Sequence, residues 1–154
     1  MKYMLDAYNI IGQLDHIQLS DPNKVNRFID WLNRHRGNTM MFYVVFDGQD
    51  PLVTFPRTER RPSIVIIHTS GERSADDYIQ DRINAMSDTS GWVVVSSDRA
   101  ILDHAKKRRV KTMNAMSFIL MLLKNESSQD ATKPEGRINQ AHIDYWLNEF
   151  GGDV

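Results

Sequence analysis

Short apolar runs alternate with amphipathic stretches along the chain, which is the pattern of β/α units and of a mainly parallel sheet. The apolar runs predict about five strands, at residues 2–6, 40–46, 63–68, 92–95 and 110–113. Apolar residues spaced three and four apart predict the helices, which are expected near residues 21–37, 74–86, 98–106 and 115–123. The pattern therefore predicts an α/β fold, in the form of a three-layer α/β/α Rossmann-like domain.

Capping and turn residues refine two of these boundaries. Asp21 is the expected N-cap of the first long helix, with Pro22 at its first helical position and Gly37 at its end. Residues 48–62 hold three prolines and three arginines, and they predict an exposed loop.

The composition divides the chain into three parts. Residues 1–124 carry the strand and helix pattern, and residues 125–137 are polar with Pro and Gly, as in a linker. Residues 138–154 predict a C-terminal helical extension with one apolar face, formed by Ile143, Trp146, Leu147 and Phe150. Such a face packs on the domain or joins two protomers, so a homodimer is one of two possible arrangements.

Composition excludes several classes of protein. A chain of 154 residues with 41% hydrophobic and 25% charged residues fits one globular domain. The absence of cysteine excludes disulfides, thiolate metal sites and a cysteine nucleophile. The N-terminal residues lack the pattern of a signal or transit peptide, and no apolar run approaches the roughly 20 residues of a membrane helix. We therefore expect a soluble, cytoplasmic protein with no membrane partner.

Acidic residues follow the predicted strands. Asp6 and Asp47 stand at the ends of apolar runs, Asp98 follows the fourth run after two serines, and Asp76 and Asp77 open the helix after the third strand. The carboxyl ends of parallel strands share one edge of a sheet, so these carboxylates are expected to converge. Converging carboxylates repel unless a hard divalent cation such as Mg²⁺ or Mn²⁺ compensates them. A site of this kind suits phosphoryl chemistry.

Each carboxylate also has a simpler structural interpretation. Asp77 completes a capping-box pattern with Ser74, Asp98 can cap the helix that follows it, and Asp47 precedes a glycine in a common turn dipeptide. No predicted helix start accounts for Asp6. The sequence also lacks the GxxxxGK[ST], GxGxxG, GxSxG and HExxH patterns, so the acidic constellation is the strongest chemical signal in the chain.

Basic residues gather in two places. One cluster runs from Arg99 to Lys111, and the other is spread over predicted loops at Arg57, Arg60, Arg61 and Arg73. The net charge is −1, so any attraction to nucleic acid must come from such local patches. An acidic metal centre with basic loops around it suits a phosphodiester substrate. Three rings could stack on unpaired bases or pack in the core, namely Tyr8, Phe55 and Tyr78.

The N-terminal segment resembles a known family. Residues 6–12, Asp-Ala-Tyr-Asn-Ile-Ile-Gly, are similar to the D-G-Y-N-hydrophobic-hydrophobic-G opening of YacP-like NYN domains, which belong to the PIN-like ribonuclease superfamily. Residues 45–47, 74–79 and 95–99 follow in the order expected for that family. The resemblance covers about residues 2–123, and the end of the chain also resembles the C-terminal extension of some bacterial members.

This resemblance implies a metal-dependent endoribonuclease that uses Mg²⁺ or Mn²⁺ and leaves 5′-phosphate and 3′-hydroxyl products. It implies metal binding by Asp6, Asp76 and Asp98, with a catalytic, orienting role for Asn9. The further candidates are Asp47 and Asp77 for metal binding, and Ser97, Arg99, Arg73, Arg57, Arg60 and Arg61 for contacts with RNA. The sequence departs from the family pattern at Ala7, where the pattern has Gly, and in residues 71–76, which are one residue longer than in some relatives.

Two other functions remain open at this stage. The chain is alternatively a non-catalytic RNA-binding or ribosome-associated module that keeps the PIN-like fold. A nuclease of the same superfamily that acts on DNA would have the same acids, because no contact with a 2′-hydroxyl can be identified from the sequence. Whether a ribosome or another partner must present the RNA is also left open.

Overall fold

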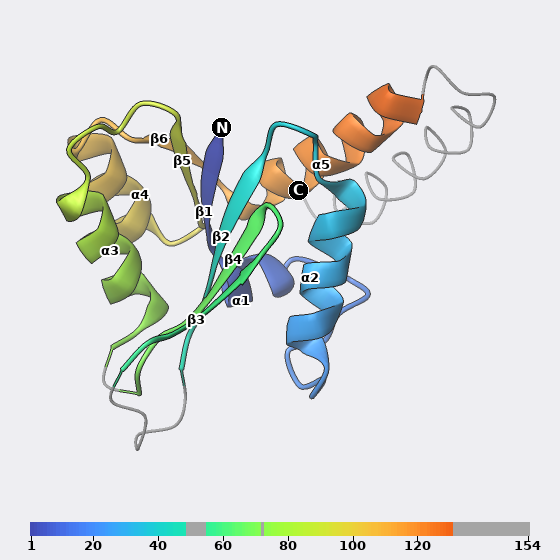
Figure 1. Cartoon of the computed structure of the whole chain (residues 1–154), viewed down its shortest axis with the longest axis horizontal. Coiled ribbons are helices and arrows are strands. Elements are labelled where there is room, and N and C mark those ends of the chain that lie inside the picture. The colour runs from blue at the N-terminus through green and yellow to red at the C-terminus, as the bar shows by residue number, and fades with distance from the viewer. Residues whose placement is uncertain (49–54, 72, 131–154) are drawn as a thin grey trace.

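A six-stranded sheet with helices on both faces forms the core of the computed structural model, which describes residues 1–48, 55–71 and 73–130 (Figure 1). The strands are β1 (Lys2–Asp6), β2 (Met41–Phe46), β3 (Arg57–Arg61), β4 (Ile64–His68), β5 (Trp92–Val95) and β6 (Lys111–Met113). The helices of this part of the chain are α1 (Ala7–Ile11), α2 (Lys24–His35), α3 (Ala75–Ala85), α4 (Arg99–Lys107) and α5 (Ala115–Asp130). The predicted α/β, Rossmann-like class is confirmed.

The order of the strands creates a binding position at one edge. The order is β3-β4-β2-β1-β5-β6, and every neighbouring pair except β3–β4 is parallel. The chain moves outward from β1 to β2 and then to the edge strand β3, returns to β4 between β3 and β2, and continues on the other side of β1 with β5 and β6. This reversal places a topological switch point at the carboxyl ends of β1 and β5, where open α/β sheets bind their ligands.

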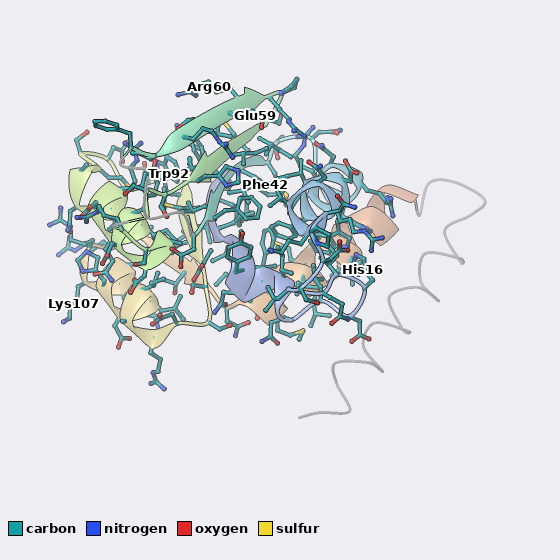
Figure 2. All side chains as sticks on the ribbon, turned by 90° about the horizontal axis from the view of Figure 1, so that it is seen from below. His16, Phe42, Glu59, Arg60, Trp92 and Lys107 are labelled. Carbon is teal, nitrogen blue, oxygen red and sulfur yellow. The ribbon has the colours of Figure 1, made fainter. Side chains whose placement is uncertain are left out.

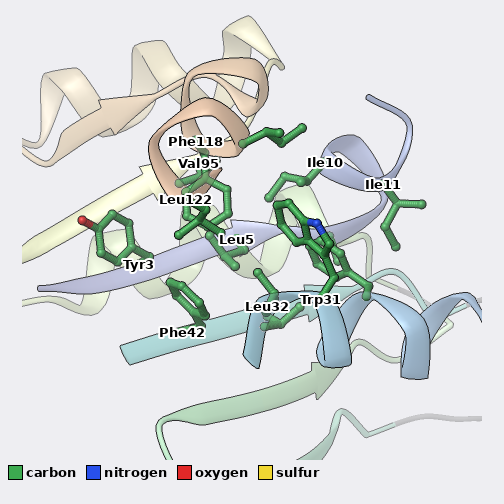
Figure 3. Packing of buried hydrophobic residues seen from close by; sticks show 14 of the residues in the cluster. Tyr3, Leu5, Ile10, Ile11, Trp31, Leu32, Phe42, Val95, Phe118 and Leu122 are labelled. Atoms are coloured by element: carbon green, nitrogen blue, oxygen red, sulfur yellow. The ribbon is translucent and has the colours of Figure 1, made fainter. Parts of the chain in front are cut away.

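Two apolar layers bury the faces of the sheet. Alternate residues along a strand point to opposite faces, so Leu5 and Val44 pack under α1, α2 and α5, whereas Met4 and Val45 pack under α3 and α4. Figure 3 shows the first layer, in which the Phe118 side chain of α5 lies among residues of the sheet. The strands β1 and β5 are consequently buried on both faces, and the loops at their ends are held on a rigid base.

Strand β3 differs from the sequence prediction. It lies within residues 48–62, which the prolines and arginines predict as a loop, and it pairs antiparallel with β4 at the edge of the sheet. All of its side chains are exposed, so neither face shows the apolar alternation by which strands are recognised. Its charged side chains are typical of an edge strand that resists pairing with another chain.

Three helix boundaries also differ. Helix α2 begins at Lys24 with Asn23 as N-cap, because the Asp21 carboxylate instead accepts a hydrogen bond from the Asn23 N–H at 2.8 Å. A short helix, α1, begins directly after Asp6, where the sequence predicts none. Helix α5 continues to Asp130, through residues 125–130 that the polar composition predicts as linker.

The rest of the predicted linker and the C-terminal helical extension, residues 131–154, lie outside the described part of the chain. Within the described part, no helix has the length and apolar character needed to cross a membrane.

Candidate functional site

Four aspartates lie at the carboxyl edge of the sheet, and the charges of three of them act on the fourth, Asp6. Asp6 ends β1, Asp47 follows β2, Asp98 follows β5, and Asp76 lies in the first turn of α3. The pKa of the Asp6 carboxyl is raised to about 6, chiefly by burial and against a hydrogen bond from Ser96 that lowers it. The negative charges of Asp98, Asp76 and Asp47, in that order, contribute smaller parts of this rise. The switch point therefore carries a concentrated negative potential around one partly buried carboxyl group.

Each of these carboxylates also has a local hydrogen-bond donor. Asp98 Oδ1 accepts from the Ala100 N–H at 2.9 Å as the N-cap of α4, and Asp47 Oδ1 accepts from the Ala75 N–H at 3.0 Å. Asp76 Oδ1 accepts from Gln80 Nε2 at 2.6 Å. In the described residues, no three acidic or histidine side chains converge closely enough to form a ready-made metal site. In this arrangement each carboxylate is paired with a hydrogen-bond donor of its own.

The chemistry of the donor set nevertheless fits a hard divalent cation. All four groups are carboxylates, which supply the oxygen ligands that Mg²⁺ and Mn²⁺ prefer. A cation at this edge would offset the repulsion that, after burial, contributes to the raised pKa of Asp6.

Asp77 lies in a different setting. Its N–H donates to Ser74 Oγ at 3.1 Å, and its carboxylate accepts from the Ser74 N–H, so the two residues form the capping box of α3. The side chain is exposed. This geometry matches the structural interpretation of Asp77 that the sequence already offered.

Ser96 connects two of the acids and was missed by sequence reasoning. Its side chain is fully buried directly after β5, where its Oγ donates to Asp6 Oδ2 at 2.9 Å and accepts from the Asp98 N–H at 3.0 Å. The only signal in the sequence is a hydroxyl residue directly after an apolar strand, which is too common to single out. In the fold, this hydroxyl orients the Asp6 carboxylate and fixes the loop that carries Asp98.

Asn9 and Ser97 hold the same loop from its other side. Asn9 Oδ1, on α1, accepts a hydrogen bond from the Ser97 N–H at 2.8 Å. Ser97 Oγ in turn accepts from the Ala115 N–H, at the start of α5, at 3.3 Å. The first strand–helix turn, the loop after β5 and α5 are thus joined by side-chain hydrogen bonds, which gives the predicted orienting residue Asn9 a definite contact.

Replacement of Asn9 by Ala is expected to free the Ser97 amide, because the change removes the acceptor of that N–H. We expect hydrogen exchange at the Ser97 amide to accelerate by about tenfold or more, corresponding to about 1–2 kcal/mol of lost local protection. Amide exchange followed by NMR measures this. Asn9→Asp is the matched control, since it keeps the Oδ1 acceptor, and equal exchange rates in Asn9→Ala and the unsubstituted protein would contradict the prediction.

The basic residues are divided between two edges of the sheet. Arg57 lies opposite His68 at the carboxyl edge, and its charge helps burial to lower the pKa of that imidazole. Arg60 and Arg61 lie opposite Val65 and Ile64, so at about 3.3 Å per residue Arg61 lies about 13 Å from Arg57, toward the opposite edge. The structure therefore does not bring Arg60 and Arg61 to the acids.

The other predicted RNA contacts lie nearer the site. Arg73, before α3, forms an ion pair with Asp81 on that helix. Arg99 is exposed at the first position of α4, next to Asp98. The remaining basic residues of the cluster from Arg99 to Lys111 lie between the end of α4 and the start of β6.

The three candidate stacking rings have different environments. Tyr8 packs edge-on against Phe46 with ring centroids 5.4 Å apart, and Lys24 Nζ lies 5.5 Å from its ring centre. Tyr78 is half-buried against the layer beneath α3 and α4, whereas Phe55 is 80% exposed. The exposed ring is the one that packing does not explain.

The comparisons with known proteins agree with this architecture. The model of the YacP-like NYN domain family matches residues 3–149. A crystal structure of a tryptophan-to-leucine mutant of Rae1 (YacP) from Bacillus subtilis is similar with a TM-score of 0.63 and 16% identity, over 93% of this chain and 90% of that chain. A second crystal structure of Rae1 (YacP) has a TM-score of 0.58 and 20% identity, over 97% and 92% of the two chains. At these identities the likeness establishes the fold. No curated protein matches the chain.

Proposed function

This chain belongs to the YacP-like NYN domain family, a family of PIN-like, ribonuclease-type domains, and on that premise we propose that it is an endoribonuclease that hydrolyses RNA with a divalent metal ion. One observation carries the proposal. Four aspartates from four segments of the chain lie at the switch point, where burial and, to a smaller extent, the charges of Asp98, Asp76 and Asp47 raise the pKa of the partly buried Asp6 carboxyl. Repulsion of this kind adds no stability to the fold, so a site that contains it favours a role in binding a cation.

The proposed cofactor is Mg²⁺ or Mn²⁺. Asp6, Asp76 and Asp98 would hold it, with Asp47 and Asp77 as further candidates. When bound, such an ion polarises a phosphate and lowers the pKa of water. The hydrogen-bonded loop of Ser96 and Ser97 would keep the acids in register for binding.

The chain's own residues would position the substrate at this edge. Arg99 and Arg57 lie where they could contact phosphates on either side of the acids, and Arg73 could do so if it exchanged its contact with Asp81 for one with RNA. Water adds to the phosphorus atom while the bond to the 3′ oxygen breaks, which leaves a 5′-phosphate and a 3′-hydroxyl. An RNA-directed enzyme of this kind would work in the cytoplasm.

The test is cleavage of a labelled, mixed-structure RNA pool in Mn²⁺. We expect EDTA to abolish cleavage and Asp98→Asn to reduce it by about 10²-fold or more. Because Asn caps a helix as well as Asp does, Asp98→Asn should leave α4 intact. Asp103→Asn, an exposed acid on the same helix, is the matched control and should cleave normally. Full activity of Asp98→Asn would remove this residue from the mechanism.

A non-catalytic RNA-binding module is the second candidate function. It is favoured by the local hydrogen-bond donors of Asp98, Asp47 and Asp76, which satisfy these carboxylates without a cation. Calorimetric titration with Mn²⁺ separates the two functions, because only the nuclease requires ion binding that Asp98→Asn weakens. Matched RNA and DNA oligonucleotides then decide the substrate, and added ribosomes show whether the RNA must be presented by a partner.

A further inference from the structure

The far end of α4 and the neighbouring strands form a second charged surface. We call it the basic edge, and it consists of six exposed cations: Lys2, Lys106, Lys107, Arg108, Arg109 and Lys111. Lys2 lies opposite Trp92 in the register of β1 and β5, and Lys111 lies opposite Val93 in the register of β5 and β6. The end of α4 lies on the same side of the sheet as the N-terminus of the chain (Figure 1), away from the acidic edge.

Within the described part of the chain, few acids lie near the basic edge. Asp103 lies one turn earlier on α4, and the Asp88 carboxylate is hydrogen-bonded by the N–H and Oγ of Ser90 at 3.0 and 2.7 Å. Across residues 1–48, 55–71 and 73–130, no ion pair joins any of the six cations to an acid. In Figure 2 the Lys107 side chain points outward at the rim of the molecule, far from Arg60 on β3. A protein with a net charge of −1 therefore concentrates positive charge at one place.

Arg109 is held in a conformation that suits glycine. It follows α4 in the left-handed region, with φ of 62°. Its N–H donates to the Lys106 carbonyl at 3.0 Å and the Val110 N–H donates to the Ala105 carbonyl at 2.9 Å, which together form a Schellman motif. Glycine occupies this position in most such motifs because a side chain there is strained.

Helix stability alone does not account for the basic edge. The helix dipole favours cations in the last turn of α4, where Lys106 and Lys107 lie. The helix dipole does not account for Lys111, which lies on a strand. It also does not account for an arginine at position 109, where glycine would be free of strain. A strained residue that carries charge to an exposed surface points to a binding role.

We propose that the basic edge binds the phosphate backbone of the RNA, as a contact surface separate from the cleavage site. The choice of RNA as the polyanion that binds here rests on the proposed function. Asp98 and Arg108 cap opposite ends of α4, so at about 1.5 Å per residue their backbones lie about 15 Å apart. At about 3.4 Å per nucleotide of a helical strand, one RNA would reach both edges with a span of about four or five nucleotides.

The test removes two cations from the basic edge without straining the fold. The variant is Lys107→Gln with Arg109→Gly, and the matched control is Arg34→Gln with Lys124→Gln, which removes two exposed cations from the layer of α2 and α5. Binding of a fluorescein-labelled RNA hairpin is measured by anisotropy in EDTA between 50 and 200 mM salt. We expect the variant to bind about tenfold more weakly, with a salt slope smaller by about 1.5–2, and the control to bind as the unsubstituted protein does.

Thermal unfolding separates a binding role from a structural one. Since glycine relieves the strain at position 109, the melting temperature should stay unchanged or rise by about 2–4 °C while RNA binding weakens. Equal hairpin affinity and equal salt slopes in variant and control would overturn the proposal. So would a variant that binds RNA normally but loses binding to phosphatidylserine–phosphatidylcholine vesicles, which would assign the surface to a membrane. Basic-edge-dependent binding without any cleavage would overturn the proposed nuclease and leave this surface in place.

Discussion

Replacement of Asp6 by Asn is expected to reduce RNA cleavage by about 10³-fold or more and, at the same time, to stabilise the metal-free protein at neutral pH. The two effects have one cause. Asp6 is the carboxyl whose pKa is raised by burial and by the charges of Asp98, Asp76 and Asp47. The same ionised group that would help to hold a cation costs folding energy when no cation is present.

The sign of the pH dependence follows from the direction of the shift. Folding raises the pKa of Asp6 from its ordinary value of 3.8 to about 6, so between these values the folded state holds a proton that the unfolded state has released. Stability therefore falls as the pH rises from about 4 to about 6, by about 3 kcal/mol in total for this change in the pKa of Asp6. Above this range the loss of stability is complete. The Asp6→Asn protein avoids this loss because its side chain at position 6 does not ionise.

Urea unfolding at pH 4 and pH 7.5 in EDTA measures the effect. We expect Asp6→Asn to be more stable than the unsubstituted protein at pH 7.5 and similar to it at pH 4. Asp103→Asn, an exposed acid on α4, is the control and should show no such difference. Mg²⁺ should raise the melting temperature of the unsubstituted protein and have little effect on Asp6→Asn. An Asp6→Asn protein that loses stability at pH 7.5 would contradict the proposed repulsion.

Replacement of Gly48 by Ala is expected to destabilise the protein by about 3 kcal/mol or more. A Cβ at this position would lie 1.8 Å from the carbonyl oxygen of Thr69 and 2.8 Å from its carbonyl carbon. These are backbone atoms of the segment after β4, so no side-chain rotation can relieve the clash. Relief of the clash would require the segments after β2 and β4 to move apart, and this movement would break the hydrogen bond from the Gly48 N–H to Thr69 Oγ1, at 2.8 Å.

The damage would extend to the site. Asp47, the preceding residue, accepts a hydrogen bond from the first N–H of α3, so a shift of this loop would also displace the helix that carries Asp76. Gly37→Ala is the matched control, because a Cβ there meets only the Met40 side chain at 3.5 Å. Chemical denaturation should show a large loss for Gly48→Ala and a change below about 1 kcal/mol for Gly37→Ala. Similar stabilities of the two variants would show that the β2 and β4 loops can separate freely.

The parts of the fold that could be predicted are those that leave a local pattern of apolar residues in the sequence. The strands β2, β4 and β5 are continuous apolar runs because both of their faces are buried, and such runs are visible without a partner. β3 was missed because its five exposed residues are held by backbone pairing with β4, which leaves no pattern in the side chains. The helical residues 125–130 were missed because their composition is as polar as that of a linker.

The candidate site was predictable to a similar degree. Asp6, Asp47 and Asp98 could be selected as candidates because the carboxyl ends of parallel strands lie at one edge of a sheet. This rule can be applied as soon as the strands are predicted from the sequence. Ser96 was not identified, because its importance lies in two hydrogen bonds that cross between β1 and the loop after β5.

The sequence by itself determined the class of fold, the family and the set of acids at the strand ends, because burial of alternating apolar runs and the order of motifs are properties of the chain alone. Only the tertiary structure decided how charge is distributed. It brought one group of carboxylates into mutual repulsion, left each with its own hydrogen-bond donor, and placed Lys106–Lys111 at the opposite edge from Asp98. The reason is that α4 runs antiparallel to the strands, so Asp98 and Arg108, ten residues apart in the sequence, lie about 15 Å apart at opposite edges of the sheet.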